Sequence, residues 1–287
     1  MEDNAGASEP FTGSPGPSDE AKEQETPLDY LYMLLGPDIF HYIADQTNIY
    51  AAQKGMSLVT ITPAGIAAFM GVNIAMGIVN LPSVREYWST NPILHHPWFG
   101  RVMPRDRFYL INRYLHFNDN DDQVDREHPL YDKRFKLRPI IERVQKTFQQ
   151  HYTPSRNVSI DEQMIGTKAR ISFLQYIPKK PKRWGVKLWV LADSQNGYVP
   201  AFDVYTGASD TVEHGLAYSV VMNLIDPYLD LGYRLYIDNY YTSPRLFADL
   251  YKRKTLACGT VRTNRRGLPS KQVGSRKCCV QSRANRV

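Results

Sequence analysis

Apolar side chains recur at helical spacing through the first half of the chain. Leu28, Leu31 and Leu35 fall on one face of an expected helix, and Ile39 and Ile43 repeat the spacing shortly afterwards. Aromatic and aliphatic residues continue this pattern to about residue 150. These positions predict a compact helical domain over residues 28–150.

A largely apolar stretch at residues 66–79 lies within this domain. Thr62 and Pro63 precede it as an N-cap and a first-turn proline, so the stretch is predicted to be a helix. Asn73 interrupts it, and it is shorter than the roughly 18 uncharged residues that a membrane span needs. We therefore expect a buried core helix and no membrane partner.

Beyond residue 150 the periodicity changes to the alternation typical of β-strands. The expected elements, in order, are strands at 158–165, 184–192 and 198–205, a helix at 211–231, a strand at 233–240, a helix at 244–254 and a strand at 256–262. Three strands, helix, strand, helix, strand is the ribonuclease H-like order. The prediction is an α/β protein in which the helical domain precedes an incomplete ribonuclease H-like core, residues 151–270, with a mixed five-stranded sheet.

Charge is unevenly distributed along the 287 residues. Residues 1–27 hold seven acids and one lysine, so the net charge of +6 for the whole chain leaves +12 for the rest. The same segment is rich in Gly, Ser, Pro and Glu, with too little apolar surface to offset the entropy of ordering. It is predicted to be a disordered acidic leader.

The remainder of the chain is basic, most of all near its end. From Tyr251 to Val287 there are eleven Lys or Arg residues and no acid, which favours a polyanionic partner over a small metabolite. Only three cysteines occur and two are adjacent, so neither a disulfide framework nor a CxxC zinc pair is indicated. Because the N-terminus also lacks a secretory signal, we expect a reducing compartment.

Two aspartates stand in strand-like segments at positions suited to metal chemistry. Asp161 lies in the first expected strand and Asp238 in the fourth. If these strands are neighbours, the carboxylates converge, and Mg²⁺ prefers such oxygen ligands. Two-metal enzymes of phosphoryl transfer use carboxylates around ions roughly 3.5–4 Å apart. A single aspartate in a strand usually faces solvent, so the expectation of weak Mg²⁺ binding depends on the pair.

A second candidate site is a cationic segment just before the second expected strand. It contains Lys179, Lys180, Lys182 and Arg183, followed by Trp184. Lysine and arginine neutralise phosphates, and an aromatic ring adds stacking or cation–π support. The segment is predicted to contact duplex DNA; a solvated loop and a nuclear-import signal are the alternatives.

Five blocks of this sequence resemble the piggyBac transposases and their domesticated relatives. The blocks occupy residues 114–120, 159–166, 176–187, 236–243 and 259–267. Long blocks in the right order are more specific than an isolated motif, and the resemblance covers about Leu28 to Ser270. It implies that Asp161 and Asp238 are the first two members of a DDD catalytic triad, and that residues 28–150 serve dimerisation and DNA binding.

The resemblance also implies an incomplete catalytic set. The family's third aspartate and its cysteine-rich zinc module lie beyond the last matching block, and residues 271–287 are expected to be a basic tail that diverges from the family. We therefore expect a truncated, nuclear, DNA-binding remnant of a DDD transposase that has lost efficient strand cleavage.

Two other functions stay open at this point. The chain is an active or partner-dependent transposase if Glu162, Asp193 or Asp203 replaces the missing ligand, or if a full-length relative completes the site in a mixed dimer. It is a non-enzymatic interaction module if its helical domain binds a protein. Salt-sensitive DNA binding and Mg²⁺-dependent nicking would separate these possibilities.

Overall fold

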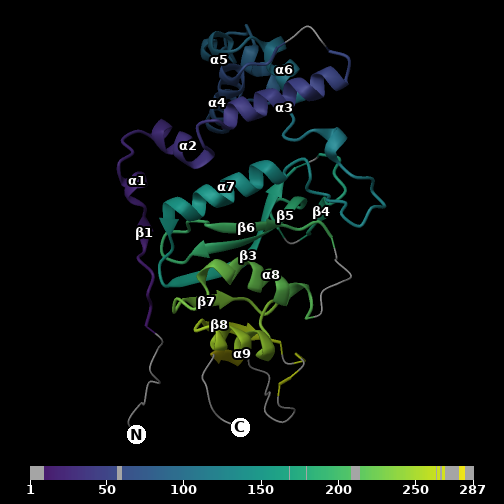
Figure 1. Cartoon of the computed structure of the whole chain (residues 1–287). Helices are drawn as coiled ribbons and strands as arrows, with labels where there is room; N and C mark the ends of the chain where they lie inside the picture. Colours follow the sequence, from purple (N-terminus) through teal and green to yellow (C-terminus); the bar gives the residue numbers. More distant parts are fainter. Residues whose placement is uncertain are drawn as a thin grey trace. The chain divides into compact units, whose positions relative to one another are not determined.

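The structure is a computed structural model of the whole chain (Figure 1). It describes residues 10–56, 60–167, 169–178, 180–207, 214–262, 264–265 and 267–268, and the backbone of 278–281. The chain divides into two compact units. We call residues 31–144 the helical unit, and residues 1–30 with 145–287 the sheet unit.

The helical unit matches the predicted pattern of helices. Its elements are the second part of α2 (Pro27–Leu35), α3 (Ile39–Gln53), α4 (Pro63–Ile78), η1 (Val84–Trp88), α5 (Pro97–Val102), α6 (Arg105–Tyr114), η2 (Asn120–Asp122) and the first half of α7 (Arg138–His151). The fully buried side chains of Ile66, Phe99 and Ile111 lie in one core cluster. This core is why α3, α4, α5 and α6 pack together without a sheet.

Helix α4 begins as the sequence predicted. The Thr62 side chain accepts a hydrogen bond from the Gly65 N–H (3.1 Å), with Pro63 in the first turn. Ile66 and Val72 are completely buried, so this helix belongs to the core. Among the described residues no helix is long and apolar enough to cross a membrane.

The sheet unit contains all five predicted strands and two more in a seven-stranded sheet. The strands are β3 (Asn157–Gly166), β4 (Gln175–Tyr176), β5 (Trp184–Asp193), β6 (Ala201–Val204), β7 (Arg234–Ile237), β8 (Leu256–Val261) and β9 (Cys278–Gln281). Their order is β4-β5-β3-β7-β8-β9, with β6 also paired to β5. Strands β3, β7 and β8 run parallel, whereas β5 pairs antiparallel with β3. The mixed sheet is therefore confirmed, with two short strands added to the predicted five.

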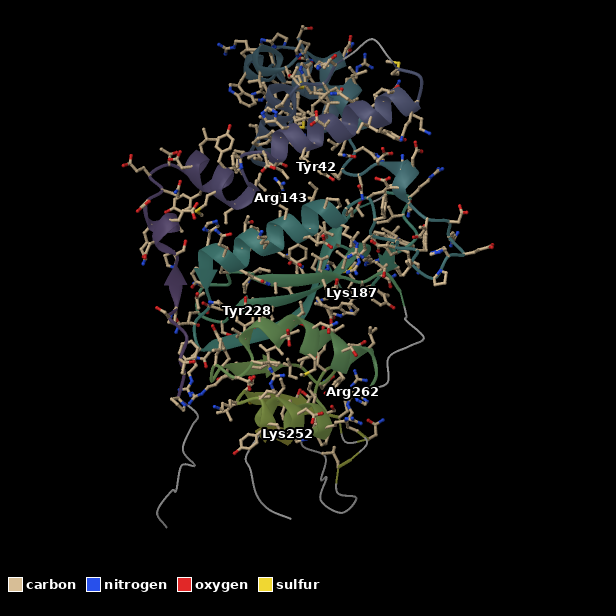
Figure 2. The ribbon with its side chains drawn as sticks, viewed as in Figure 1. Tyr42, Arg143, Lys187, Tyr228, Lys252 and Arg262 are labelled. Carbon is tan, nitrogen blue, oxygen red and sulfur yellow. The ribbon has the colours of Figure 1, made fainter. Side chains whose placement is uncertain are left out.

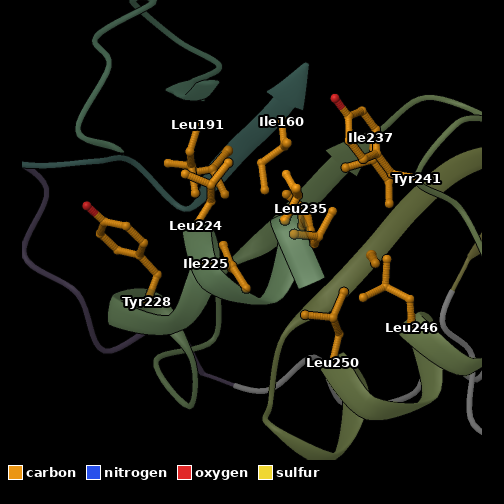
Figure 3. Packing of buried hydrophobic residues seen from close by; sticks show 14 of the residues in the cluster. Ile160, Leu191, Leu224, Ile225, Tyr228, Leu235, Ile237, Tyr241, Leu246 and Leu250 are labelled. Atoms are coloured by element: carbon orange, nitrogen blue, oxygen red, sulfur yellow. The ribbon is translucent and has the colours of Figure 1, made fainter. Parts of the chain in front are cut away.

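One face of this sheet is covered by α8 (Leu216–Ile225) and α9 (Pro244–Lys252) (Figure 3). Ile160, Leu235 and Ile237 from the sheet pack against Leu224 and Leu246 from the two helices. Alternation along the strands sends Asp161 to the opposite face.

The first of these helices is shorter than predicted. We expected a helix at 211–231, but α8 ends at Ile225, and a short 3-10 turn, η3 (Asp226–Tyr228), follows it. Pro227 explains the break, because its ring removes one N–H and clashes with the preceding helical turn. Residues 208–213, where the predicted helix begins, lie outside the described residues.

The prediction of a disordered leader is wrong for residues 10–27. Strand β1 (Gly16–Pro17) pairs with β2 (Tyr152–Thr153), and α1 (Asp19–Lys22) follows. The Phe11 ring packs edge-on against Tyr233 with centroids 4.9 Å apart. A side chain at Gly232 would collide with Pro10 and Phe11, so this glycine permits the contact. The Phe11–Tyr233 contact and the β1–β2 pairing thus hold in place a segment whose composition predicted disorder. Residues 1–9 lie outside the described residues.

The predicted tail at 271–287 also contains a structural element. The backbone of β9 pairs antiparallel with β8, with Cys278 opposite Val261 and Gln281 opposite Cys258. A purely divergent tail was expected because composition carries no information about pairing with a distant sheet edge. The residues around β9 lie outside the described part of the chain.

Candidate functional site

The parallel pairing of β3 with β7 places the two predicted aspartates side by side. Ile160 of β3 is opposite Ile237 of β7 in the register. Asp161 directly follows Ile160, and Asp238 directly follows Ile237. Side chains at equal register in parallel strands project to the same face. Both aspartates are exposed. The register therefore places both aspartates at the same end of the β3–β7 pair, with Asp161 on the face opposite α8 and α9.

Local hydrogen bonds orient each carboxylate. Asp161 Oδ1 accepts the Glu162 N–H at 2.8 Å, and Asp238 Oδ1 accepts the Tyr240 N–H at 2.8 Å. The second contact closes an Asx turn directly after β7. Thr242 donates its hydroxyl to the Asp238 carbonyl oxygen at 2.8 Å, which fixes the same turn from the other side.

A close backbone approach supports this turn. A Cβ at Gly259 on β8 would collide with Thr242 Oγ1 and lie 2.5 Å from the Ile237 carbonyl oxygen. Only glycine allows β8 to approach the end of β7 so closely. This explains the Gly259 of the sequence block 259–267 in physical terms.

The buried Tyr241 hydroxyl lies within the electrostatic influence of the site's carboxylates. Its side chain is 1% exposed, and its hydroxyl has no hydrogen-bond partner among the described residues. Burial raises the pKa of Tyr241 most, and the charges of Glu162, Asp161 and Asp238 raise it further. Three carboxylates therefore act on one buried hydroxyl.

Glu162 belongs to the opposite face of β3 and is bound to lysines. Its carboxylate lies 3.8 Å from Lys180 Nζ and 3.9 Å from Lys187 Nζ. The Lys187 ammonium also lies 5.4 Å from the centre of the Tyr240 ring and 5.8 Å from Trp189 (Figure 2). This cation–π contact connects Glu162 with the turn that holds Asp238.

The other two acids considered as replacements lie in structural positions. Asp193 is 1% exposed and accepts hydrogen bonds from the Ser155 N–H at 2.8 Å and the Tyr152 hydroxyl at 3.0 Å. Burial acts to raise the pKa of Asp193, but these hydrogen bonds lower it overall. Asp203 lies on β6, and its Oδ1 accepts a hydrogen bond from the Val204 N–H at 2.9 Å.

The side chains present fit a divalent cation only in part. Asp161 and Asp238 offer the hard oxygen ligands that Mg²⁺ prefers. Across the described residues, however, no three His, Cys, Asp or Glu side chains are grouped as a metal ion requires. The aspartate pair alone supplies two ligands, which is compatible with weak binding of one ion.

Two arginines that the sequence reading did not single out support the Asp238 turn. Arg265 Nη2 donates to the carbonyl oxygens of Asn239 (2.8 Å) and Tyr240 (2.6 Å), and Arg262 Nε donates to Asn239 Oδ1 (3.1 Å) (Figure 2). Two guanidinium groups thus contact the turn that follows Asp238. The clustered arginines of block 259–267 were the available signal, but their partner is 23 or more residues away in the chain.

The structure divides the predicted cationic site. Lys180 is engaged with Glu162, whereas Lys182 and Arg183 are exposed in the turn before β5. Lys179 lies outside the described residues. Trp184 is the first residue of β5 and packs on Tyr176 of β4, a partner that the sequence reading missed because a two-residue strand is too short for periodicity.

These features define a ribonuclease H-like core in which a mixed sheet presents paired aspartates from neighbouring strands. The comparisons then give the family. A family model described as Transposase IS4 matches residues 26–285. The chain belongs to this family of piggyBac-type transposases, as its sequence blocks predicted. Transposases of this kind are typically metal-dependent.

Curated relatives and a solved structure agree. The chain is 31% identical over 262 residues to human PiggyBac transposable element-derived protein 2, covering 89% of this chain and 43% of that protein. It is 30% identical over 254 residues to human PiggyBac transposable element-derived protein 3, covering 86% and 41%. A piggyBac transposase synaptic complex with hairpin DNA superposes with a TM-score of 0.79 at 26% identity, covering 92% of this chain and 57% of that one.

The comparisons also correct one expectation. The family match extends to residue 285, beyond the limit at Ser270 inferred from the sequence blocks. The chain spans less than half the length of the two curated relatives.

Proposed function

We propose that this polypeptide binds duplex DNA through its phosphates and does not cut or join DNA strands by itself. One observation supports both parts: the sheet that carries the aspartate pair also presents exposed cations, and the pair lacks a third carboxylate among the described residues. The neighbouring solved structure is a transposase bound to DNA.

The binding part rests on charge. Residues 28–287 carry +12, since residues 1–27 account for −6 of the overall +6. Lys182 and Arg183 are exposed at one end of the sheet, and Arg262 lies beside the Asp238 turn. Cations on one molecular unit, separated along a sheet, suit a polyanion that extends past several contact points.

The catalytic part rests on ligand number. A bound divalent cation would stabilise the charge on a phosphate undergoing displacement. Asp161 and Asp238 would hold such an ion, whereas Glu162 lies on the opposite face of β3 and pairs with Lys180 and Lys187. In-line displacement with two ions requires further carboxylate ligands, so these residues alone give little stabilisation of the transition state. A full-length relative in a mixed dimer would be one source of the missing ligand.

The salt dependence of binding tests the first part. If about five phosphates are neutralised, the slope of log affinity against log salt for a 16-base-pair duplex is roughly −4 to −5, at about −0.9 per contact. Lys182→Ala with Arg183→Ala should flatten the slope by about 2, whereas the exposed pair Lys22→Ala with Lys146→Ala serves as the control. Fluorescence anisotropy between 50 and about 300 mM salt measures it.

The outcomes are distinct. An affinity that does not change with salt concentration would support the protein-interaction alternative. So would a Lys182→Ala, Arg183→Ala variant whose salt slope equals that of the control. Nicking of plasmid DNA in Mg²⁺ by the wild type, lost in Asp161→Asn, would show that another acid completes the site. We also propose that the protein is nuclear, as a chromosomal DNA partner would require, and microscopy of the tagged chain would test this.

A further inference from the structure

An exposed pair of aromatic rings stands at the β4–β5 end of the sheet. Tyr176 and Trp184 are directly opposite each other in the antiparallel register. Their ring centroids are 4.8 Å apart, at an interplanar angle of 41°. The two residues remain 48% and 53% exposed. Two aromatic rings in contact on an exposed surface are a candidate binding surface, and we call this pair the aromatic platform.

The platform lies on the same face of the sheet as the aspartates. Every second residue from Trp184 to Val190 shares one face of β5, and Val190 is opposite Asp161 on β3. The β3–β5 pairing continues without a bulge to Gly166, and the Thr167 N–H donates to the Trp184 carbonyl oxygen at 3.2 Å. From Asp161 to Thr167 the chain advances six residues, or about 20 Å.

The backbone holds the platform in place before any ligand arrives. A side chain at Gly185 would collide with the Ile165 carbonyl oxygen, so β5 approaches β3 closely there. The Ile177 N–H donates to the Arg183 carbonyl oxygen at 2.8 Å, which closes the turn between the two rings. A preformed surface loses little conformational freedom on binding.

The chemistry around the rings identifies the ligand. Lys182 and Arg183 are exposed directly beside the platform, and no acidic residue occurs from Leu174 to Ala192. Aromatic rings beside cations bind single-stranded nucleic acid, because bases stack while phosphates are neutralised. A base pair inside a duplex has its faces covered by its neighbours, so only an unpaired base can use the rings.

We propose that Tyr176 and Trp184 stack an unpaired nucleobase of the DNA whose backbone reaches Asp161 and Asp238. At about 3.4 Å per nucleotide of one strand, the platform lies roughly six nucleotides from the aspartates. The inference rests on the proposed function, and it adds a preference for DNA with an unpaired segment over a fully paired duplex.

Tryptophan fluorescence tests the platform directly. The chain has four tryptophans, of which Trp184 is 53% and Trp98 45% exposed. Single-stranded (dT)12 should quench the wild type and Trp98→Phe, but not Trp184→Phe, which keeps a ring while removing the fluorophore. Trp184→Ala should weaken (dT)12 binding by about 5- to 150-fold, the range for loss of one stacked base. Trp184→Phe should recover most of that affinity.

The same variants separate this inference from the proposed function. Affinity for a blunt duplex should change less than about twofold in Trp184→Ala, because phosphate contacts dominate there. Wild-type (dT)12 affinity in Trp184→Ala, or quenching that persists in Trp184→Phe, would overturn the platform while leaving duplex binding intact. A wild type that binds neither oligonucleotide would refute both proposals, and the rings would then belong to a protein partner.

Discussion

Asp193 allows the sharpest test of stability, because this acid, a candidate metal ligand by sequence, is buried and hydrogen-bonded in the structure. Its carboxylate accepts four hydrogen bonds, from the Tyr152 hydroxyl (3.0 Å), the Ser155 N–H (2.8 Å), the Ser155 hydroxyl (2.5 Å) and the Gln195 N–H (2.9 Å). These contacts join the end of β5 to the chain that enters β3. They therefore support the strand that carries Asp161.

The magnitude follows from what Asp193→Ala would leave behind. A hydrogen bond to a charged group contributes about 1.5–3 kcal/mol, and a buried donor without a partner costs about 1–3 kcal/mol. The four bonds share one carboxylate, so their contributions overlap rather than add. We expect the free energy of unfolding of the sheet unit to fall by about 4 kcal/mol, which corresponds to roughly 8–16 °C in Tm.

Urea unfolding followed by tryptophan fluorescence measures this change, since Trp189 is buried in the same unit. Exposed Asp226→Ala is the control and should stay within about 0.5 kcal/mol of wild type. A loss below about 1 kcal/mol in Asp193→Ala would refute the reasoning, because it would mean that the network contributes no more than one ordinary hydrogen bond.

The pH dependence has a definite sign. Hydrogen bonds hold the pKa of Asp193 below its ordinary value in the folded state. A depressed folded pKa gives stability that is present above the unfolded value, about 3.9, and is lost as pH falls through the folded pKa. The stability difference between wild type and Asp193→Asn should therefore be constant from about pH 5 to 8 and shrink below about pH 4.

Two further predictions concern the metal site and the N-terminal segment. Asp161→Asn should lower Mn²⁺ affinity at least about tenfold by calorimetry with an unchanged unfolding midpoint, whereas exposed Asp45→Asn should change neither the affinity nor the midpoint; equal affinity in both variants would remove Asp161 from the site. Phe11→Ala should destabilise the sheet unit by about 2 kcal/mol in urea unfolding, because a half-buried ring against Tyr233 is lost; no change would mean that the Phe11–Tyr233 contact contributes nothing to its stability.

Much of the fold could be predicted because it is encoded locally. Five strands and helix α4 appear in the sequence as alternation, helical spacing and a capping residue, each of which acts over a few neighbouring positions. The aspartate pair was predictable for a related reason. Its two strands occur in an order that defines neighbours, so Asp161 and Asp238 had to meet once that order was recognised.

Other features depend on contacts between residues that are distant in the chain. Phe11 packs against Tyr233, and Tyr176 packs against Trp184 across a turn. Composition described the first segment as disordered, and periodicity cannot detect a strand of two residues. Both limits arise because a local pattern does not record which surface a segment will bury.

The sequence by itself determined the class of this protein, its strand order and the two aspartates, since long blocks and periodic patterns carry that information within the chain. Only the tertiary structure decided the roles of the remaining acids and cations. Asp193 became structural and Glu162 became paired with Lys187, while Trp184 became half of an exposed platform. The physical reason is that charge, burial and hydrogen bonding depend on the register of strands, which places side chains from distant positions within a few ångströms of one another.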